Sequence, residues 1–474
     1  MLNITQDDYN IIKQRITERY IKISLLDFNY NIVDEISGEM LSCSVQCDAD
    51  SDLRRSCSVG LIVANKTFDI QPGGRLFLDR YIQVYVGLKN IRSDEVQWYN
   101  QGIYLIDAPS FNYDATNNTL SFTGLDLMSK LTGARNGQLE GIPTVIKQGE
   151  SVREAMIATL KLGGFTKYIV SECKNRDGTA QAVPYDIEID QGGYVYDILA
   201  KLRDILPQYQ IFFDVDGVFH YELIPSGDNE PVLIDDDIWK NVLIGENINT
   251  DFASVKNYIE VYGRTHDPEY YPSEISVADN VITMTIAKMT ELNANNIIGF
   301  TPNKAVTGNI QINLNTFGAK DLVDSNGSHI TSLENNVYYV AQYTKDGKWL
   351  FLGHQQAKAT WSDTNPESPF FVDGPVGRIR QVLCGGDYDN IMSDELALER
   401  AKVEIYWKCR LNDSISLNII PIPWIDVNIV VSHAPKDSEI QNKYIVKSYS
   451  VDYGNINATM SVSMISYYAY YPIY

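Results

Sequence analysis

The chain has no long apolar run and few basic residues, and both absences narrow its possible functions. No stretch of its 474 residues approaches the roughly 20 apolar residues that a membrane-spanning helix needs. The N-terminal MLNITQDDYNIIKQR lacks the basic-then-apolar order of a secretion signal. We therefore expect that the chain has no membrane-spanning segment and that it is made and first folds in a cytoplasm. The 61 acidic residues outnumber 39 basic ones, giving a net charge of −22, which argues against a protein that wraps nucleic acid.

The motifs of common enzyme and cofactor sites are also missing. There is no phosphate-cradling G-x-x-x-x-G-K-[ST], no G-x-G-x-x-G after a strand, no G-x-S-x-G and no H-E-x-x-H. The histidines are dispersed without metal-ligand spacing: His220, His266, His329, His354 and His433. A glycosidase-type carboxylate pair stays open, because a sequence gives no distances. We expect no enzyme activity, with no catalytic, cofactor-binding or metal-binding residues and no cofactor.

Cysteine is sparse, and only three of the six cysteines, Cys43, Cys47 and Cys57, lie near one another. A zinc site needs four ligands at short paired spacings, and no histidine or fourth cysteine is close by. In SCSVQC the residues Cys43, Val45 and Cys47 alternate, so in a strand they share one face. The pattern predicts thiols buried in a core.

The stretch QIFFDVDGVFHYELIP, residues 210–225, is similar to the catalytic loop of haloacid-dehalogenase-type phosphatases, whose first Asp is a nucleophile. In those enzymes the nucleophile follows a buried strand and leads into a helix, whereas here a second alternating strand follows. Asp216-Gly217 favours a two-residue type I′ hairpin turn, which needs positive φ at both positions. We predict a hairpin without catalytic or calcium chemistry, pairing Val215 with Val218, Phe213 with His220, and Phe212 with Tyr221.

Capping signals predict four helices. Thr5 and Asp8 have capping-box spacing before an apolar run, and Ser151 precedes VREAMIATLKL. A further apolar stripe runs over 194–206 and ends before Pro207. Ser393 and two acidic residues precede LALERAKVEIYWK. Between and around these helices the sequence alternates as β-strands, notably over 20–122 and from 255 onward.

An internal repeat is the strongest sign of domain organisation. Residues 104–122, YLIDAPSFNYDATNNTLSF, align without a gap with 444–462, YIVKSYSVDYGNINATMSV, at a constant offset of 340. Six positions are identical: Tyr104/Tyr444, Ser110/Ser450, Tyr113/Tyr453, Asn117/Asn457, Thr119/Thr459 and Ser121/Ser461. Both segments are predicted to be hairpins, and chance similarity of two hairpins is the alternative. The repeat indicates two copies of one β-domain.

We therefore predict a mainly β protein in which two related β-barrel domains flank a small α+β domain, with a β-rich insert. The expected parts are an N-terminal helix and first barrel over 1–138, the α+β domain over 139–248, the start of the second barrel over 249–289, the insert over 290–374, and a helix with the remainder of the second barrel over 375–474.

Within this order of domains, several stretches resemble the tail-hub proteins of long-tailed bacteriophages, which form the centre of a baseplate or tail tip. They are TLSFTGLDLMSKL, GGYVYDILAKLRDILPQYQIFFDVDGVFHYELIP, VKNYIEVYGR, and NPESPFFVDGPVGRIRQVLCGGDYDNIMSDELALERAKVEIYWK with PIPWIDVNIVVSH. The resemblance covers most of 20–470, although its motifs are packing signatures and the insert has no counterpart.

The resemblance implies a structural virion protein that forms a homotrimer around the tail axis. Two barrels per chain then give six barrels, which can meet a six-fold tail tube. The implied partners are tail tube or distal tail proteins and central spike or fibre proteins. DNA would pass transiently without specific binding, through a channel that we expect to be acidic or neutral.

The implied location is the virion tail, after assembly in the host bacterial cytoplasm. Because the sequence stops soon after the second barrel, we expect any lytic activity to belong to another protein. Two other classes stay open: a tail-associated cell-wall or polysaccharide hydrolase, and a modular β-adhesin.

Overall fold

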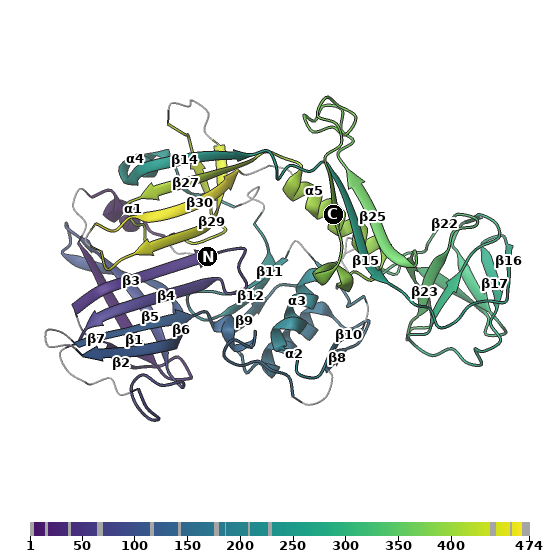
Figure 1. Ribbon diagram of the computed structural model, residues 1–474, viewed down its shortest axis with the longest axis horizontal. Helices are drawn as coiled ribbons and strands as arrows, with labels where there is room; N and C mark the ends of the chain where they lie inside the picture. The colour runs from purple at the N-terminus through teal and green to yellow at the C-terminus, as the bar shows by residue number, and fades with distance from the viewer. Residues whose placement is uncertain are drawn as a thin grey trace.

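The computed structural model describes residues 4–14, 18–36, 39–63, 70–113, 118–140, 144–174, 180–184, 186–206, 209–225, 230–436, 442–455 and 457–466. It is mainly β, which confirms the expected fold class, and its two β-halves lie beside a small α+β unit, an arm and a projecting insert (Figure 1). None of the helices in these ranges has the length and apolar character needed to cross a membrane.

The N-terminal half begins with a short helix and continues as antiparallel strands. Thr5 caps α1 (Gln6–Ile12) in a full capping box with Asp8, as predicted. The strands are β1 (Arg19–Leu26), β2 (Ile32–Ile36), β3 (Glu39–Asp48), β4 (Arg55–Ile62), β5 (Tyr81–Asn90), β6 (Glu95–Tyr113) and β7 (Asn118–Leu125).

The C-terminal half is assembled from segments far apart in the sequence. Its elements are β13 (Val232–Ile234), α4 (Asp236–Val242), β14 (Leu243–Asp251), β27 (Asn412–Ile419), β28 (Val430–His433), β29 (Asn442–Asp452) and β30 (Met460–Ser466). Strand β29 pairs with β3, so both halves belong to one sheet in the order β14-β27-β30-β29-β3-β4-β7-β6-β5-β1-β2, with β28 beside β29 and β13 beside β28. In Figure 1 β14 lies at the top edge of this joined sheet.

The two halves have the same strand order. The series β3-β4-β7-β6-β5-β1 corresponds to β14-β27-β30-β29-β28-β13, and each series visits its positions in the same sequence along the chain. One direction differs, because β1 pairs antiparallel with β5 whereas the short β13 pairs parallel with β28. The predicted repeat is therefore part of a larger structural duplication.

The register of the repeated hairpins agrees before and after a bulge whose exact position differs between them. Ser110 lies opposite Ser121 in the first hairpin, and Ser450 lies opposite Ser461 in the second. Each hairpin also has a bulge, between Asp107 and Ser110 in β6 and beginning after Val446 in β29. A bulge shifts every following side chain relative to its partner, so a shared bulge is a specific structural match. Asn117 of the repeat lies outside the described residues.

The α+β unit lies to the right of the N-terminal half in Figure 1. It contains η1 (Leu127–Lys130), β8 (Thr144–Ile146), α2 (Val152–Leu162), β9 (Tyr168–Val170), β10 (Ile187–Ile189), α3 (Val195–Ile205), β11 (Tyr209–Phe213) and β12 (Phe219–Leu223). Ser151 caps α2 as predicted, and the apolar stripe of α3 is buried. Helices α2 and α3 and the hairpin β11–β12 pack together around a separate hydrophobic core.

The arm carries the insert away from the joined sheet. It consists of β15 (Tyr258–Thr265), β25 (Gln356–Ser362), β26 (Arg380–Leu383), η2 (Gly386–Asn390) and α5 (Asp394–Lys408), which Ser393 caps as expected. The insert contains β16 (Glu274–Ala278), β17 (Val281–Thr285), β18 (Ile297–Phe300), β19 (Val306–Thr307), β20 (Gln311–Leu314), β21 (Ala319–Val323), β22 (Ser332–Leu333), β23 (Tyr339–Tyr343) and β24 (Trp349–Gly353).

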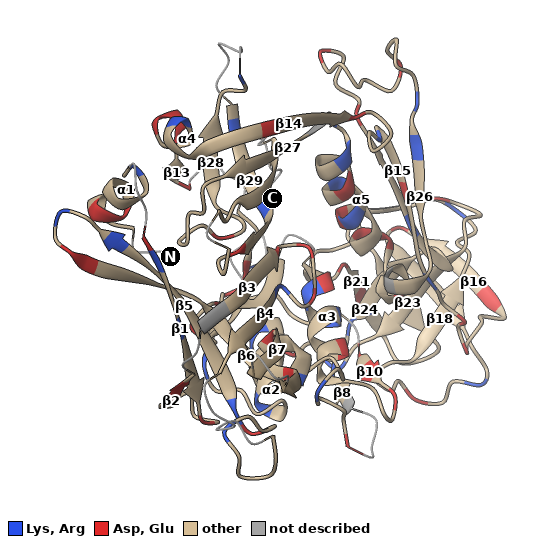
Figure 2. Cartoon of the chain, turned by 60° about the vertical axis from the view of Figure 1, so that its left-hand side comes forward, with Lys and Arg blue, Asp and Glu red and all other residues tan. Residues whose placement is uncertain are grey.

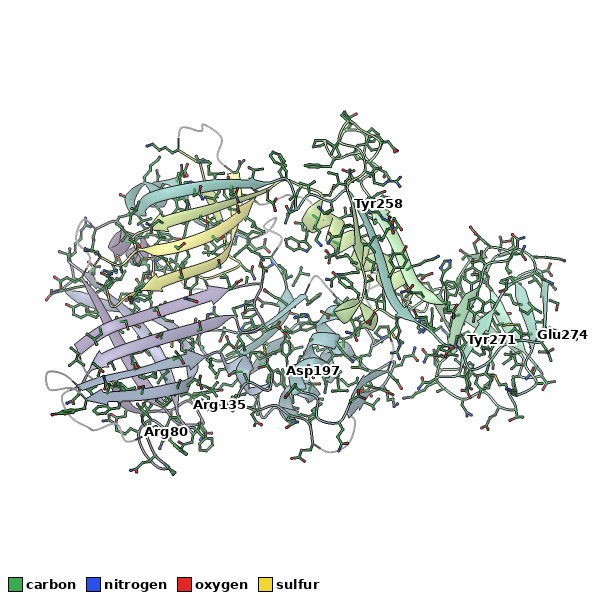
Figure 3. All side chains as sticks on the ribbon, in the orientation of Figure 1. Arg80, Arg135, Asp197, Tyr258, Tyr271 and Glu274 are labelled. Carbon is green, nitrogen blue, oxygen red and sulfur yellow. The ribbon has the colours of Figure 1, made fainter. Side chains whose placement is uncertain are left out.

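Tyr258 marks the start of the arm in Figure 3, and Glu274 marks the far end of the insert. The strands of 258–285, expected at the start of the second barrel, pair in the sheets of the arm and the insert instead. Their alternation resembles that of the barrel strands, so the pattern alone did not assign them to a sheet.

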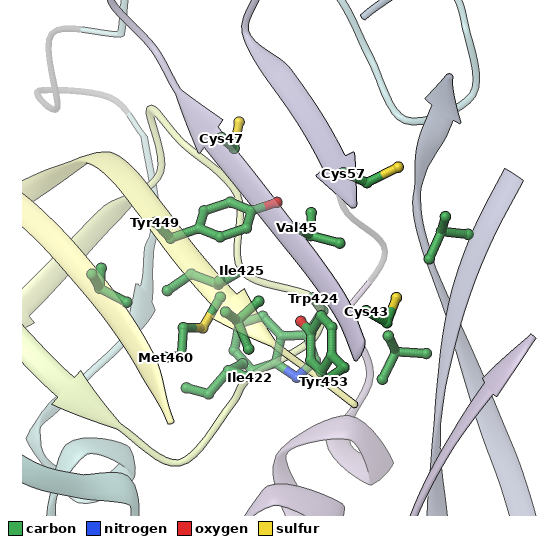
Figure 4. Packing of buried hydrophobic residues seen from close by; sticks show 14 of the residues in the cluster. Cys43, Val45, Cys47, Cys57, Ile422, Trp424, Ile425, Tyr449, Tyr453 and Met460 are labelled. Atoms are coloured by element: carbon green, nitrogen blue, oxygen red, sulfur yellow. The ribbon is translucent and has the colours of Figure 1, made fainter. Parts of the chain in front are cut away.

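The core of the joined sheet draws side chains from both halves, and Figure 4 shows part of it at the joint. Cys43, Cys47 and Cys57 are free and buried there, which confirms the prediction of core thiols. Burial raises the pKa of the Cys43 and Cys47 thiols to about 12, so neither is a nucleophile near neutral pH.

Candidate functional site in the joined sheet

The segment that is similar to a phosphatase loop forms the predicted hairpin, but in a different register. Phe213 pairs with Phe219 and Phe212 with His220, one residue away from the expected pairing. The amide of Gly217 donates to the carbonyl of Asp214 at 3.1 Å, so the turn is longer than a two-residue type I′ turn. Gly217 alone among the turn residues has positive φ, at 72°. The predicted type I′ turn is therefore wrong, because Asp214 organises a longer one.

Asp214 has a structural role in this turn. Its Oδ1 accepts hydrogen bonds from the amides of Asp216 and Val218 at 3.0 and 2.9 Å, and its Oδ2 lies 3.0 Å from His220 Nε2. Burial alone would lower the pKa of His220, but contacts with Asp214 and Glu222 raise it to about 9. The carboxylate is therefore held by backbone amides and a cationic histidine.

The remaining candidates for chemistry also have structural roles. The histidines do not assemble, and across the described ranges no group of three His, Cys, Asp or Glu side chains is placed to hold a metal ion. Burial raises the pKa of Asp126 and Glu395, but they belong to different units. Asp126 Oδ1 accepts from the amide of Met128 to cap η1, and Glu395 accepts from Ser325.

An ion pair between the buried Arg55 and the partly exposed Asp426 connects the two halves with the α+β unit. Arg55 of β4 donates to both carboxylate oxygens of Asp426 at 2.5 and 2.6 Å, and its Nη1 donates to the carbonyl of Phe213 at 2.7 Å. Burial alone would lower the pKa of Arg55, but Asp426 raises it well above its usual range. One side chain thus touches all three parts, which fixes how they meet.

The joint between the halves is a regular antiparallel ladder. Strand β29 pairs with β3 from Ser448 opposite Asp48 to Asp452 opposite Ser44. Beyond the last pair, the amide of Tyr453 donates to the carbonyl of Cys43 at 2.8 Å. Val45 and Val451 lie opposite each other in this ladder and are fully buried. The core therefore continues across the joint without interruption.

The opposite side of the joined sheet is lined mostly by small uncharged polar side chains, and we call it the polar face. Its residues alternate with core residues along eight neighbouring strands, from β14 to β6. They are Asn247, Asn249 and Asp251; Ser414, Ser416 and Asn418; Ser461 and Ser463; Ser448, Ser450 and Asp452; Ser42, Ser44, Gln46 and Asp48; Ser56 and Ser58; Thr119, Ser121 and Thr123; and Asp107, Ser110 and Asn112.

The polar face has four acidic residues and no Lys or Arg in this set. At one end of the row Arg54 follows the same alternation, but it is buried, with its guanidinium donating to Gln210 Oε1 at 2.7 Å and stacked on Phe212. Figure 2 shows many charged residues, in blue and red, on α5, whereas the strands of the joined sheet are largely tan because they carry few charged residues. The face is thus neutral to acidic.

We did not identify the polar face from the sequence, although its signal was there. The strands SCSVQC, SISLNI and MSVSMIS alternate Ser, Asn or Gln with aliphatic residues or cysteine. Alternation predicts strands with one solvated side, but it does not show what that side contacts. Joining eight such strands into one surface requires the strand order, which the sequence does not show.

Comparisons with known proteins agree with this architecture. Residues 367–473 match the model of a domain of unknown function (DUF5048). No curated protein matches the sequence. The solved 43 kDa tail protein of prophage MuSo2 from Shewanella oneidensis aligns with 94% of this chain and 98% of its own, at a TM-score of 0.50 and 10% identity. The tail protein from Neisseria meningitidis MC58 aligns over 94% and 96% of the two chains, at 0.49 and 9%.

The comparison with the MuSo2 protein shows that this mainly β chain has the fold of a solved phage tail protein. The chain has the fold of the MuSo2 tail protein over nearly its full length. The resemblance inferred from sequence is therefore confirmed at the level of the fold. At 10% identity the likeness carries no assignment of individual residues.

Proposed function

We propose that the chain is a structural, non-enzymatic component of a phage tail, and that three copies form a hub at the centre of a baseplate or tail tip. In this proposal the polar face lines a channel through which DNA passes. The hub joins a six-fold tail tube to three-fold components such as a central spike or fibre. It is located in the virion tail after assembly in the host bacterial cytoplasm.

The observation that carries this proposal is the continuous polar face. Proteins that hold DNA neutralise phosphates with Lys and Arg, which releases condensed counterions and makes binding salt-dependent. A surface of hydroxyl, amide and acidic groups gives no such release, and a neutral hydroxyl gains little by exchanging water for a phosphate. Such a wall lets DNA slide without retaining it.

The duplication within the chain supports a three-chain ring. Two equivalent halves per chain give six similar units in three chains, which lets a three-fold body meet a six-fold tube with near-equivalent contacts. Eight strands per chain carry the polar face. At about 4.8 Å between strands, three chains give a wall about 115 Å around and about 37 Å across, before strand tilt widens it. That width admits a DNA duplex.

Two measurements test the proposal. Light scattering of the purified protein should give the mass of three chains, and electron microscopy should show a three-fold ring with a central opening. Fluorescently labelled duplex DNA should remain unbound at both 50 and 200 mM salt. A stable monomer at high concentration contradicts the hub, and salt-sensitive DNA binding contradicts the non-binding channel.

A further inference from the structure

The open edges of the joined sheet indicate how neighbouring chains meet. Within the chain, β3 of the N-terminal half is covered by β29 of the C-terminal half. We propose that the equivalent edge, β14, is covered in the same register by the end of β6 from a second copy of this chain. This inference rests on the proposed three-chain ring, and it names the strands and residue pairs that close it.

Strands β14 and β3 are equivalent in detail. Val45 lies opposite Cys57 in β4, and Ile248 lies opposite Ile415 in β27, so the two strands correspond at an offset of 203 residues. Each strand has one bulge, around Leu41 in β3 and around Ile244 in β14. These bulges are at matching positions, because 41 and 244 also differ by 203.

The end of β6 is equivalent to the part of β29 that covers β3. Ser110 and Phe111 pair with β7 in the register in which Ser450 and Val451 pair with β30, as the repeat requires. Among the described strands this end of β6 pairs only with β7, and β14 pairs only with β27. Each open edge thus matches one side of the existing joint.

The exposure of matched residues shows that the open edges lack the pairing strand that is present at the joint. Val45 is 0% exposed in the joint, whereas its counterpart Ile248 is 46% exposed. Tyr453 is 3% exposed, whereas its counterpart Tyr113 is 74% exposed. An open strand edge with exposed apolar residues favours pairing with another chain. Pairing the two open edges buries both residues, as their counterparts are buried in the joint.

The register of the joint fixes the register of the proposed contact. Ser450 lies opposite Gln46 and Val451 opposite Val45. The corresponding pairs between chains are Ser110 with Asn249, Phe111 with Ile248, and Asn112 with Asn247. The hydrophilic pairs extend the polar face around the ring, and the apolar pair extends the core.

The ladder is expected to begin at Ser110. The preceding residue, Pro109, has no amide hydrogen, so it cannot donate the bond that its counterpart Tyr449 is placed to make. At the other end, Cys43 donates its amide to Asp452 Oδ1 at 3.0 Å. Asn112 supplies a side-chain oxygen at the position of Asp452, where it can accept from the amide of Glu246.

A disulfide tests the register directly. Residues 110 and 249 correspond to a non-hydrogen-bonded pair, in which Cα atoms are about 4.5 Å apart, within disulfide range. In a Cys384→Ser background, which removes an exposed native thiol, we expect S110C/N249C to oxidise to three linked chains on a non-reducing denaturing gel. The matched in-chain pair Q46C/S450C should oxidise without any increase in mass.

The off-register pair S110C/N247C serves as the control, because its Cα atoms would be about 8 Å apart, beyond disulfide range. A protein that is a trimer by light scattering but does not cross-link through S110C/N249C overturns this inference and leaves the hub proposal intact. A protein that stays monomeric overturns both. Equal cross-linking of the off-register pair also overturns the proposed register.

A matched pair of substitutions tests the same contact without cysteine. Ile248→Asp places a charge where the second chain should pack, so the fraction of trimer should fall at least tenfold at micromolar concentration. Ile244→Asp is the control, since Ile244 is 56% exposed and its counterpart Leu41 stays 50% exposed within the joint. Circular dichroism checks that both chains are folded. Equal loss of trimer in both variants, or in neither, contradicts the proposal.

Discussion

The two halves of the joined sheet share their strand order and most of their register, including a matching bulge in β3 and β14, yet they differ in what covers their edges. In the N-terminal half the edge of β3 pairs with β29, and its inward residues Cys43 and Val45 are buried. The matching positions of β14 are occupied by Glu246 and Ile248, which are partly exposed. The duplication therefore preserves the backbone pattern, while side chains follow the local partner.

The halves also differ in their support from the α+β unit. The turn of the hairpin β11–β12 lies against the N-terminal half, where Asn100 donates to Asp216 Oδ1 at 2.8 Å. The C-terminal half meets the unit near Arg55 and Asp426, beside the joint. The N-terminal half is thus braced at two places. The following predictions remove one difference at a time, beginning with the largest expected effect.

Arg55→Met should cause the largest loss of stability, because it separates the joint from the α+β unit. Removing one partner of a fully buried ion pair costs about 3–5 kcal/mol. Because the remaining Asp426 is partly exposed, we expect a loss near the lower end of this range, about 3 kcal/mol. We expect urea unfolding to shift accordingly. The double variant Arg55→Met/Asp426→Leu should recover a large part of this loss. A single-variant loss below about 1 kcal/mol would show that the pair does not hold the parts together.

Truncating the matched residues Val45 and Ile248 should give unequal effects. Val45→Ala removes buried methyl groups from the closed joint and should lower the free energy of unfolding by about 2 kcal/mol. Ile248→Ala at the open edge should change it by less than about 0.5 kcal/mol in the dissociated chain. Urea unfolding at low protein concentration measures both. Equal losses would mean that the two edges are covered alike within one chain.

Gly217→Val should weaken the contact between the β11–β12 turn and the N-terminal half. A β-branched side chain would be held at φ 72°, and its Cβ would lie 3.1 Å from Leu127 Cδ1. We expect a loss of 1 kcal/mol or more by thermal or urea unfolding, with Gly217→Asn less harmful because Asn tolerates this region better. Equal stability of the wild type and the valine variant would contradict the observed turn.

The contact between the β11–β12 turn and the N-terminal half should weaken as pH rises, because the same turn contains the His220–Asp214 ion pair. Because the pKa of His220 is about 9 in the fold and about 6.5 when unfolded, its stabilisation is complete below about pH 6.5 and lost as pH rises through about 9. The full difference between these two pKa values corresponds to about 3 kcal/mol. Solvent screening of this partly exposed pair reduces the expected loss across that window to about 1 kcal/mol. Replacing His220 with Gln should flatten the difference in unfolding curves, whereas replacing the exposed His329 should not.

Asp216→Asn should have the smallest effect, within about 0.5 kcal/mol, because its amide oxygen can still accept from Asn100. Neither this change nor Asp214→Asn should alter phosphate release from a generic phosphomonoester, which we expect at background in every variant. Metal-dependent release that disappears in Asp214→Asn would contradict the structural role of this turn.

The sequence predicted the local elements better than their assembly. Caps at Thr5, Ser151 and Ser393 and the thiols of β3 were predicted correctly, because these features depend on residues close in sequence. The prediction of a type I′ turn at Asp216-Gly217 was wrong, because Asp214 accepts hydrogen bonds from two amides of its own loop. The repeat pointed to paired domains, but the β29–β3 contact joins residues about 400 apart. Alternation could not show that contact, nor the polar face that depends on it.

A density map of the assembled protein at side-chain resolution tests the central claim most directly. The account predicts three chains in a closed ring, with the polar face toward the central channel and Phe111 of one chain opposite Ile248 of the next. A ring whose channel is lined by Lys and Arg, or one in which the outer edge of β14 faces solvent, would contradict it.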